Sequence, residues 1–158
     1  MSNLRIGTGY DVHKFSKGTS LIIGGCKIDF KFGLAGYSDA DVLIHSIIDS
    51  ILGAAGLGDI GDHFPPGDEK YLNISSLELL EEIARLLKEN DYKIINIDTT
   101  IIAEKPKLSG YKEKMKNNIS KVLKINEEQV NIKATTTEKL GFVGRVEGIA
   151  CQAITLIE

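Results

Sequence analysis

Residues 38–55, SDADVLIHSIIDSILGAA, form a helical segment that is apolar around a single histidine, His45. Ser38 and Asp39 are good N-cap residues, and the glycines that follow Ala55 end the helix. A helix this apolar has to be covered on most sides, so we expect it to pack over the face of a β-sheet.

Strand patterns surround this helix. Residues 4–10 alternate apolar and polar side chains, and Gly7 and Gly9 allow another backbone to approach closely. Gly24 and Gly25 split residues 21–29 into a hairpin. Further strands are predicted at residues 93–103, 130–136 and 149–157.

Two amphipathic helices complete the pattern. Ser75 and Glu78 have the spacing of a capping box, and apolar residues from Leu77 to Leu87 then follow one helix face. A third helix begins near Tyr111. The interleaved elements predict one α+β domain, residues 1–158, with a mixed sheet and helices packed on one of its faces. Self-association is the expected cover for the other face.

Composition excludes several classes of protein. The net charge of −3 argues against general binding to nucleic acid or acidic membranes. Cys26 and Cys151 lie far apart, so neither a disulfide framework nor a cysteine-rich zinc module is indicated. No signal segment or apolar run near 20 residues is present. We therefore expect a cytoplasmic protein, or one in a plastid-type organelle if a transit peptide was removed.

Asp11, His13 and His45 can together hold one zinc ion. Residues 11 and 13 point to the same side of a strand, and His45 can approach from a helix packed over that side. Three protein ligands and one open position are typical of catalytic zinc. The alternative is two hydrogen-bonded, partly buried histidines. His63 could add a fourth ligand, but its Gly- and Pro-rich loop favours a substrate contact.

Asp41 and Asp49 flank His45 at helical spacing. A metal-bound imidazole usually donates its other N–H to a carboxylate or carbonyl group. Both aspartates are therefore candidates to orient His45.

A second group of polar residues lies in ATTTEKLGFVGRVEG. Thr135, Thr136 and Thr137 lead into Glu138, whose carboxylate suits Mg²⁺ when phosphates supply the other ligands. The alternative is a threonine-rich strand followed by a glycine-rich turn, in which Arg145 and Glu147 form an ordinary ion pair.

The chain resembles the 2-C-methyl-D-erythritol 2,4-cyclodiphosphate synthase family. The resemblance rests on the order and spacing of RIGTGYDVH, SDADVLIH, ILGAAGLGDIGDHFP, TIIAEKPK and KATTTEKLGFVGRVEGIA, which together span nearly the whole chain. It implies a homotrimer whose sheets face a central axis, with three active sites at the subunit interfaces. The implied reaction converts 4-diphosphocytidyl-2-C-methyl-D-erythritol 2-phosphate to the 2,4-cyclodiphosphate and CMP, in the non-mevalonate isoprenoid pathway.

The resemblance also implies roles for single residues. Zinc would be held by Asp11, His13 and His45, and Mg²⁺ or Mn²⁺ by Glu138 beside the substrate diphosphate. The implied catalytic residues are Thr136, Tyr37 and Ser38. The implied substrate contacts are Asp59 and Gly61 near the methylerythritol unit; Phe64 and Asp68, with no particular part of the substrate assigned; Ala103, Pro106, Lys107 and Leu108 at the cytidine; Thr135 near the diphosphate; and Phe142 and Arg145 at a central cavity that can hold an isoprenoid diphosphate.

The sequence departs from the family pattern at three places. Tyr37 stands where many members have a histidine, although its hydroxyl can still donate a hydrogen bond. Ala40 replaces a common glycine at the expected helix start, where alanine is the better helix former. PPGD at residues 65–68 replaces a loop that commonly reads PDTD.

Two other functions fit the same residues. A zinc-dependent phosphoester hydrolase would use water in place of a tethered phosphate. A non-catalytic trimeric module could bind isoprenoid phosphates around a structural zinc ion.

Overall fold

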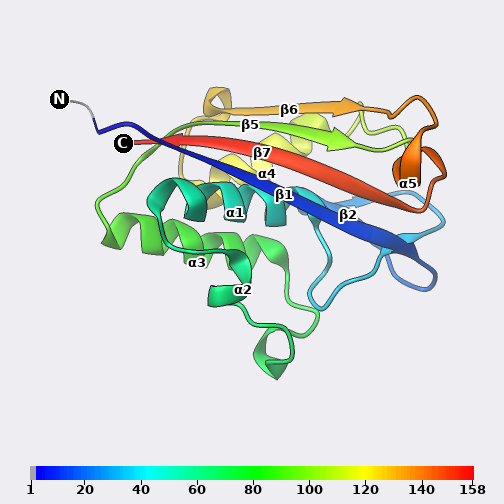
Figure 1. Cartoon of the computed structure of the whole chain (residues 1–158), viewed down its shortest axis with the longest axis horizontal. Helices are drawn as coiled ribbons and strands as arrows, with labels where there is room; N and C mark the ends of the chain where they lie inside the picture. Colours follow the sequence, from blue (N-terminus) through cyan, green and yellow to red (C-terminus); the bar gives the residue numbers. More distant parts are fainter. Residues whose placement is uncertain (1–2) are drawn as a thin grey trace.

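A five-stranded mixed sheet, in the order β4-β1-β7-β5-β6, forms one layer of the protein (Figure 1). The structure, a computed structural model, describes residues 3–158, so the first two residues of the predicted domain lie outside the described residues. Strands β5 and β6 pair in parallel, and the other neighbours pair antiparallel. The strands are β1 (Arg5–Ser16), β4 (Gly33–Leu34), β5 (Ile94–Ile102), β6 (Val130–Thr135) and β7 (Gly148–Ile157), with a separate hairpin of β2 (Leu21–Ile23) and β3 (Cys26–Ile28).

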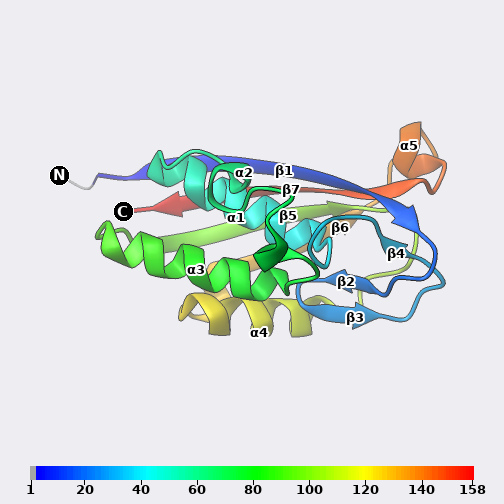
Figure 2. The same ribbon diagram turned by 90° about the horizontal axis from the view of Figure 1, so that it is seen from below.

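Three long helices lie on one side of this sheet (Figure 2). Helix α1 packs against β1 and β7, α4 packs against β6, and α3 contacts both helices. None of the helices in residues 3–158 combines the length and apolar character needed to cross a membrane. The helices are α1 (Val42–Ala55), α2 (Ile60–His63), α3 (Ser76–Glu89), α4 (Lys112–Leu123) and α5 (Gly141–Gly144), with short 3₁₀ turns at η1 (Glu69–Tyr71) and η2 (Glu127–Gln129). The predicted α+β fold, with helices on one face of a mixed sheet, is confirmed.

Helix α1 is the centre of the core. All of its residues are buried except His45, Asp49 and Gly53. It lies unusually close to β1 because the strand has no side chain at Gly7 or Gly9. A Cβ atom at Gly7 would lie 2.1 Å from the Ser50 carbonyl oxygen, and one at Gly9 would lie 1.9 Å from the Ser46 carbonyl oxygen. The close approach predicted from the two glycines is therefore present.

The start of α1 differs from the prediction. Its N-cap is Asp41, not Ser38 or Asp39, because Ala40 has a left-handed φ of 56° that cannot continue a helix. Alanine is therefore not the better residue at position 40, where glycine would be unstrained. The buried Asp41 carboxylate accepts hydrogen bonds from the amides of Ile44, Gly24 and Gly25, which ties the helix to the β2–β3 hairpin.

The start of α3 also differs in detail. Ser75 is the N-cap, as expected, but its side chain makes no capping hydrogen bond, so the predicted capping box with Glu78 is absent. The Asp39 carboxylate instead accepts the amide hydrogen of Ser76, the first residue of α3. A carboxylate from another segment thus stabilises this helix end. The loop expected around His63 contains the short helix α2.

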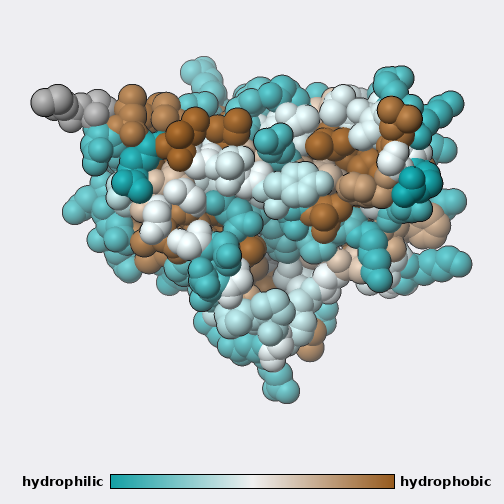
Figure 3. All heavy atoms as spheres, in the orientation of Figure 1, coloured by the Kyte–Doolittle hydropathy of each residue, from teal (hydrophilic) through white to brown (hydrophobic). Residues whose placement is uncertain are grey.

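The opposite face of the sheet is uncovered and partly apolar (Figure 3). Ile6, Tyr10, Val12 and Ile154 are 69%, 56%, 45% and 40% exposed. On β1, Ile6, Tyr10 and Val12 alternate with the residues that face α1, so they lie on the side of the sheet away from the helices. Exposed apolar side chains on one face of a sheet are typical of a surface that binds another protein.

The α1–β1 contact predicts a sharp difference between two glycine substitutions. Gly9→Ala should lower the free energy of unfolding by about 3 kcal/mol or more, since its methyl group would overlap the α1 backbone. Gly53→Ala is the control on the facing helix, where the added Cβ meets only ordinary contacts, the nearest at 3.7 Å. It should be neutral or stabilise by about 0.5–1 kcal/mol through helix propensity. Urea unfolding of both variants measures the difference, and equal stability of the two would contradict this account of the contact.

Candidate metal centre and substrate cavity

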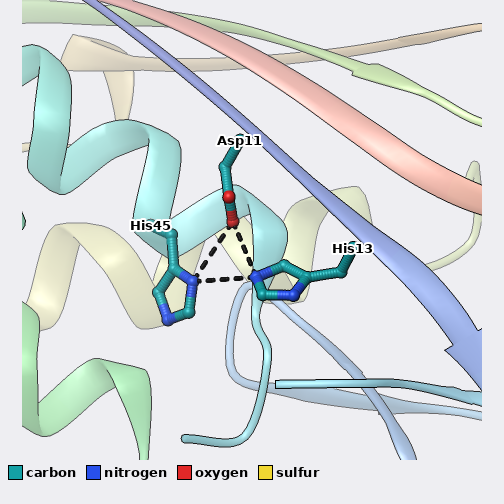
Figure 4. Close-up of side chains that lie close together, drawn as sticks. All are labelled: Asp11, His13 and His45. Carbon is teal, nitrogen blue, oxygen red and sulfur yellow. Dashed lines mark hydrogen bonds and ion pairs between the residues drawn. The ribbon is translucent and has the colours of Figure 1, made fainter. Parts of the chain in front are cut away.

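Asp11, His13 and His45 bring one ligand atom each to a common point (Figure 4). The Asp11 Oδ2 atom lies 2.9 Å from His13 Nε2 and 3.2 Å from His45 Nδ1, and the two nitrogens are 3.1 Å apart. Asp11 and His13 project from the same side of β1 as Gly7 and Gly9, and His45 projects from α1. The spatial arrangement predicted from the sequence is therefore present.

Each imidazole is oriented through the ring nitrogen that faces away from this point. The His13 Nδ1 atom lies 2.7 Å from the Ala35 carbonyl oxygen, which can only accept, so Nδ1 carries the hydrogen. The His45 Nε2 atom lies 2.9 Å from Ser76 Oγ and 3.1 Å from Ser38 Oγ. His13 Nε2 and His45 Nδ1 are thus left to face Asp11.

The electrostatics of the cluster favour a cation. Burial acts to raise the pKa of Asp11, but hydrogen bonds and charge from His13 and His45 hold it well below its usual range. Burial acts to lower the pKa of His13, but the bond to the Asp11 carboxylate and its negative charge raise it. The pocket therefore keeps an anion on Asp11 and attracts positive charge to His13.

The donor set fits a divalent metal ion. Two imidazole nitrogens and a carboxylate oxygen are ligands that zinc accepts, and three protein ligands leave a position open for substrate or water. All three side chains are only partly buried and line one cavity of about 200 Å³. An ion held there would be reachable from that cavity.

Several predicted substrate contacts line the same cavity. Tyr37, Ser38, Gly61 and Phe64 all border it, together with Pro66 of the divergent PPGD loop. Two other predicted contacts have structural roles nearby. The Asp59 carboxylate caps α2 by accepting from the Asp62 amide, and the Asp68 carboxylate accepts from the Lys70 amide at the start of η1.

The prediction that Asp41 or Asp49 orients His45 is wrong. The Asp41 carboxylate is buried among the amides that it accepts from, and burial and the charge of Asp39 raise its pKa to about 6. The Asp49 carboxylate accepts from the Ile60 amide at 2.8 Å, and burial raises its pKa. Helical spacing put them on adjoining parts of α1, but each carboxylate is engaged by a backbone donor from another segment.

Thr135, Thr136 and Glu138 lie at the far end of β6 and in the turn that follows. Thr136 Oγ1 lies 3.4 Å from Glu138 Oε1, and both residues are exposed. The Thr135 carbonyl oxygen accepts the Ala103 amide hydrogen at 2.9 Å, which places the segment of Pro106, Lys107 and Leu108 beside this turn. Arg145 and Glu147 form an exposed ion pair with an Nε–Oε1 distance of 2.9 Å, as the alternative interpretation proposed, and Phe142 lies on α5.

Sequence patterns missed the residue that holds this turn in place. The Glu104 carboxylate accepts hydrogen bonds from the amides of Thr137 and Lys139 at 3.1 and 2.9 Å. Glu138 and Lys139 both have left-handed φ angles, of 52° and 64°, so the turn is a defined conformation. The one sequence signal for Glu104 was its place in TIIAEKPK, a motif on which the family resemblance rests.

The Asp11, His13 and His45 cluster and the turn that carries Thr136 and Glu138 lie on different strands of the sheet and do not meet within one chain. Strands β7 and β5 lie between β1 and β6. In the sheet register Val12 pairs with Ala150, Ala150 with Ile102, and Ile102 with Thr135. Three strand spacings of about 4.8 Å separate Val12 from Thr135 by roughly 14 Å.

A protein-family model described as the YgbB family matches residues 4–158. The chain belongs to this family. The YgbB family assignment agrees with the curated 2-C-methyl-D-erythritol 2,4-cyclodiphosphate synthase of Clostridium novyi (strain NT), which is 60% identical over 154 residues that cover 98% of each chain. The resemblance inferred from the sequence motifs is confirmed.

Solved structures agree with the YgbB assignment. IspF from Plasmodium falciparum, in a complex with CDP, is 39% identical and superposes with a TM-score of 0.86, covering 99% of this chain and 97% of that one. The bifunctional IspDF from Campylobacter jejuni is 44% identical with a TM-score of 0.94 over 98% of this chain. This YgbB chain spans 42% of the length of that bifunctional protein.

The cluster predicts a change in histidine titration in the metal-free protein. Asp11→Asn should lower the pKa of His13, because the substitution removes the negative charge and the charged acceptor that raise it while burial remains. NMR titration of the imidazole resonances measures the shift. His63, whose Nε2 bonds the Leu57 carbonyl oxygen away from the cluster, provides the internal reference signal. An unchanged His13 pKa would mean that Asp11 does not set the charge of this site.

Proposed function

We propose that the protein is a 2-C-methyl-D-erythritol 2,4-cyclodiphosphate synthase of the non-mevalonate isoprenoid pathway. The observation that carries the proposal is the Asp11, His13 and His45 cluster, open to a cavity that Tyr37, Ser38 and Gly61 border. The named activity of a 60% identical relative of nearly equal length supports this enzyme. Nothing favours a zinc-dependent hydrolase or a non-catalytic binding module.

The proposed reaction is an intramolecular phosphoryl transfer. An oxygen of the substrate 2-phosphate attacks the β-phosphorus of the same molecule, the bond from that phosphorus to the CMP oxygen breaks, and CMP leaves. The attacking group is already an anion, so no protein base is needed. Catalysis then depends on positioning the two phosphates and on neutralising their charge.

Two metal ions fit the polar residues. Asp11, His13 and His45 would hold Zn²⁺, and Glu138 would contribute to a site for Mg²⁺ or Mn²⁺ beside the diphosphate. When bound, these ions neutralise phosphate charge and polarise the phosphorus–oxygen bonds. Ser38 and Tyr37 present hydroxyl groups to the 2-phosphate end of the substrate in the cavity, and Thr136 donates to the reacting diphosphate from the exposed turn.

We infer that the cytidine end of the substrate binds beside β6. The CDP complex of the P. falciparum relative supports a cytidine nucleotide as part of the substrate. Ala103, Pro106, Lys107 and Leu108 would contact the base and ribose, and Thr135 the diphosphate.

We further propose that the active site lies between subunits of a homotrimer. The cytidine segment follows β5 and Glu138 follows β6, which are two and three strands away from the β1 strand that carries Asp11 and His13, so a neighbouring chain can bring its own copy closer. The uncovered apolar sheet face would be buried around a central axis. Phe142 and Arg145 would lie near that axis, where an isoprenoid diphosphate could bind.

The activity test follows the products by mass. Protein with Zn²⁺ and Mg²⁺ should convert the cytidyl substrate to CMP and the cyclic diphosphate, and a linear phosphate product would support the hydrolase instead. His13→Ala should abolish zinc binding and turnover without loss of the fold. Glu138→Gln should weaken the Mg²⁺ dependence and retain zinc, so simultaneous loss of zinc would count against separate metal sites.

Mixing two variants, each impaired in a different metal site, tests the shared active site. If one chain supplies His13 and its neighbour supplies Glu138, trimers reassembled from equal amounts of His13→Ala and Glu138→Gln chains contain some sites with neither substitution. Random assembly leaves about one quarter of the sites intact, so about one quarter of the wild-type activity should return. A site built within one chain would show no recovery, because every chain carries a defect. Each variant alone, reassembled in the same way, is the control.

A further inference from the structure

The orientation of His45 depends on two residues that the proposed chemistry does not otherwise use. Its Nδ1 atom faces Asp11 and His13, and its Nε2 atom lies 2.9 Å from the hydroxyl oxygen of Ser76. Ser76 is the first residue of α3 and is fully buried. Helices α1 and α3 therefore meet at this hydrogen bond.

The Ser76 hydroxyl is held by the Asp39 carboxylate. Ser76 Oγ makes a short hydrogen bond to Asp39 Oδ1, and the Ser76 amide donates to Asp39 Oδ2 at 3.0 Å. The Asp39 Oδ1 atom also accepts the Asp41 amide hydrogen at 3.2 Å. These three donors fix the carboxylate in place.

The proton positions follow from the donor inventory. An ionised carboxylate only accepts, so the single hydrogen of the Ser76 hydroxyl points to Asp39. The oxygen of that hydroxyl then offers a lone pair to His45, and His45 Nε2 has to carry a hydrogen. The Nδ1 atom faces Asp11 and His13, so it is the ring nitrogen that a metal ion there would bind.

We propose that Asp39 and Ser76 are positioning residues, which hold His45 in the Nε2–H tautomer so that Nδ1 is available to a metal ion. The inference rests on the metal centre proposed above. The negative charge of Asp39 polarises the Ser76 hydroxyl, which strengthens its bond to the imidazole and makes Nδ1 a better ligand. Asp39 and Ser76 thus fix the ring orientation and the outward N–H of His45, as the Ala35 carbonyl group does for His13.

Ser38 does not duplicate this role. Its hydroxyl also lies near His45 Nε2, at 3.1 Å, but it borders the substrate cavity. Within residues 3–158, no carboxylate accepts a hydrogen bond from Ser38 that would fix the direction of its hydroxyl hydrogen. It is free to turn toward a phosphate, whereas Ser76 is committed to Asp39.

Substitution of Ser76 tests the hydrogen-bonded relay, the connection from Asp39 through Ser76 to His45, with two measurements. In the metal-free protein, ¹⁵N chemical shifts of the His45 ring report which of its nitrogens carry hydrogen, and Ser76→Ala should lower the fraction of molecules with a hydrogen on Nε2. Zinc affinity, measured by competition with a chelator, should fall by about 10–100-fold. Ser75→Ala is the matched control, because the neighbouring side chain makes no capping hydrogen bond, and it should change neither quantity.

Asp39→Asn provides a second variant if Ser76→Ala does not fold. It should shift the tautomer and weaken zinc binding in the same direction, and the double variant should bind zinc no more weakly than Ser76→Ala alone, because Asp39 acts through Ser76. An unchanged tautomer overturns the proposal, even with weaker zinc binding, since Ser76 would then act only through packing.

The outcome separates the relay from the proposed function. Wild-type protein that forms the cyclic product while Ser76→Ala keeps its tautomer and zinc affinity would refute the relay alone. Wild-type protein that binds no zinc would refute the metal centre, and the metal-free tautomer measurement would still decide whether Asp39 and Ser76 orient His45.

Discussion

The close packing of α1 on β1 is the contact on which the rest of the structure depends. Gly7 and Gly9 leave no room for a Cβ atom between the strand and the Ser46 and Ser50 carbonyl groups of the helix. Because side chains alternate along a strand, Asp11 and His13 continue the same face beyond the glycines, and His45 precedes Ser46 on the helix. The backbone approach that builds the core therefore also brings together the three ligand atoms, at 2.9–3.2 Å from one another. The same close packing therefore determines both the stability of the core and the geometry of the Asp11, His13 and His45 cluster.

The segment between β4 and α1 connects this contact to the rest of the molecule. Asp41 caps α1 and holds the β2–β3 hairpin, Asp39 holds the first residue of α3, and Ser38 borders the cavity beside the three-residue cluster. Three residues within this four-residue stretch therefore have different partners, and the left-handed backbone of Ala40 turns Asp39 and Asp41 toward theirs. The result is a pair of imidazoles whose outward nitrogens are engaged and whose inward nitrogens face a carboxylate. Such an arrangement concentrates negative charge and lone pairs where a cation can bind.

In the proposed trimer, the uncovered sheet face would link assembly to activity. A monomer would leave Ile6, Tyr10 and Val12 in water, and it would hold the metal cluster and the Glu138 turn on opposite sides of two strands. The proposed trimer with shared sites would resolve both difficulties with one interface. The same burial that stabilises the assembly would then set the distance between the two halves of the site, so substitutions on the apolar face are expected to act on catalysis as well as on association.

The sequence by itself determined the order of strands and helices, the apolar helix, the glycine face of β1 and the set of metal-ligand candidates. These features depend on periodicities of two and 3.6 residues and on side-chain types, both of which are visible in short stretches of sequence. Only the tertiary structure decided which carboxylate serves which partner. Asp41 and Asp49 have the helical spacing of orienting residues, yet backbone amides of Gly24, Gly25 and Ile60 engage them, while Ser76 reaches His45 from 31 residues away. A buried carboxylate accepts hydrogen bonds from the donors that the fold places beside it. Those donors belong to segments distant along the chain, so short sequence patterns do not identify them.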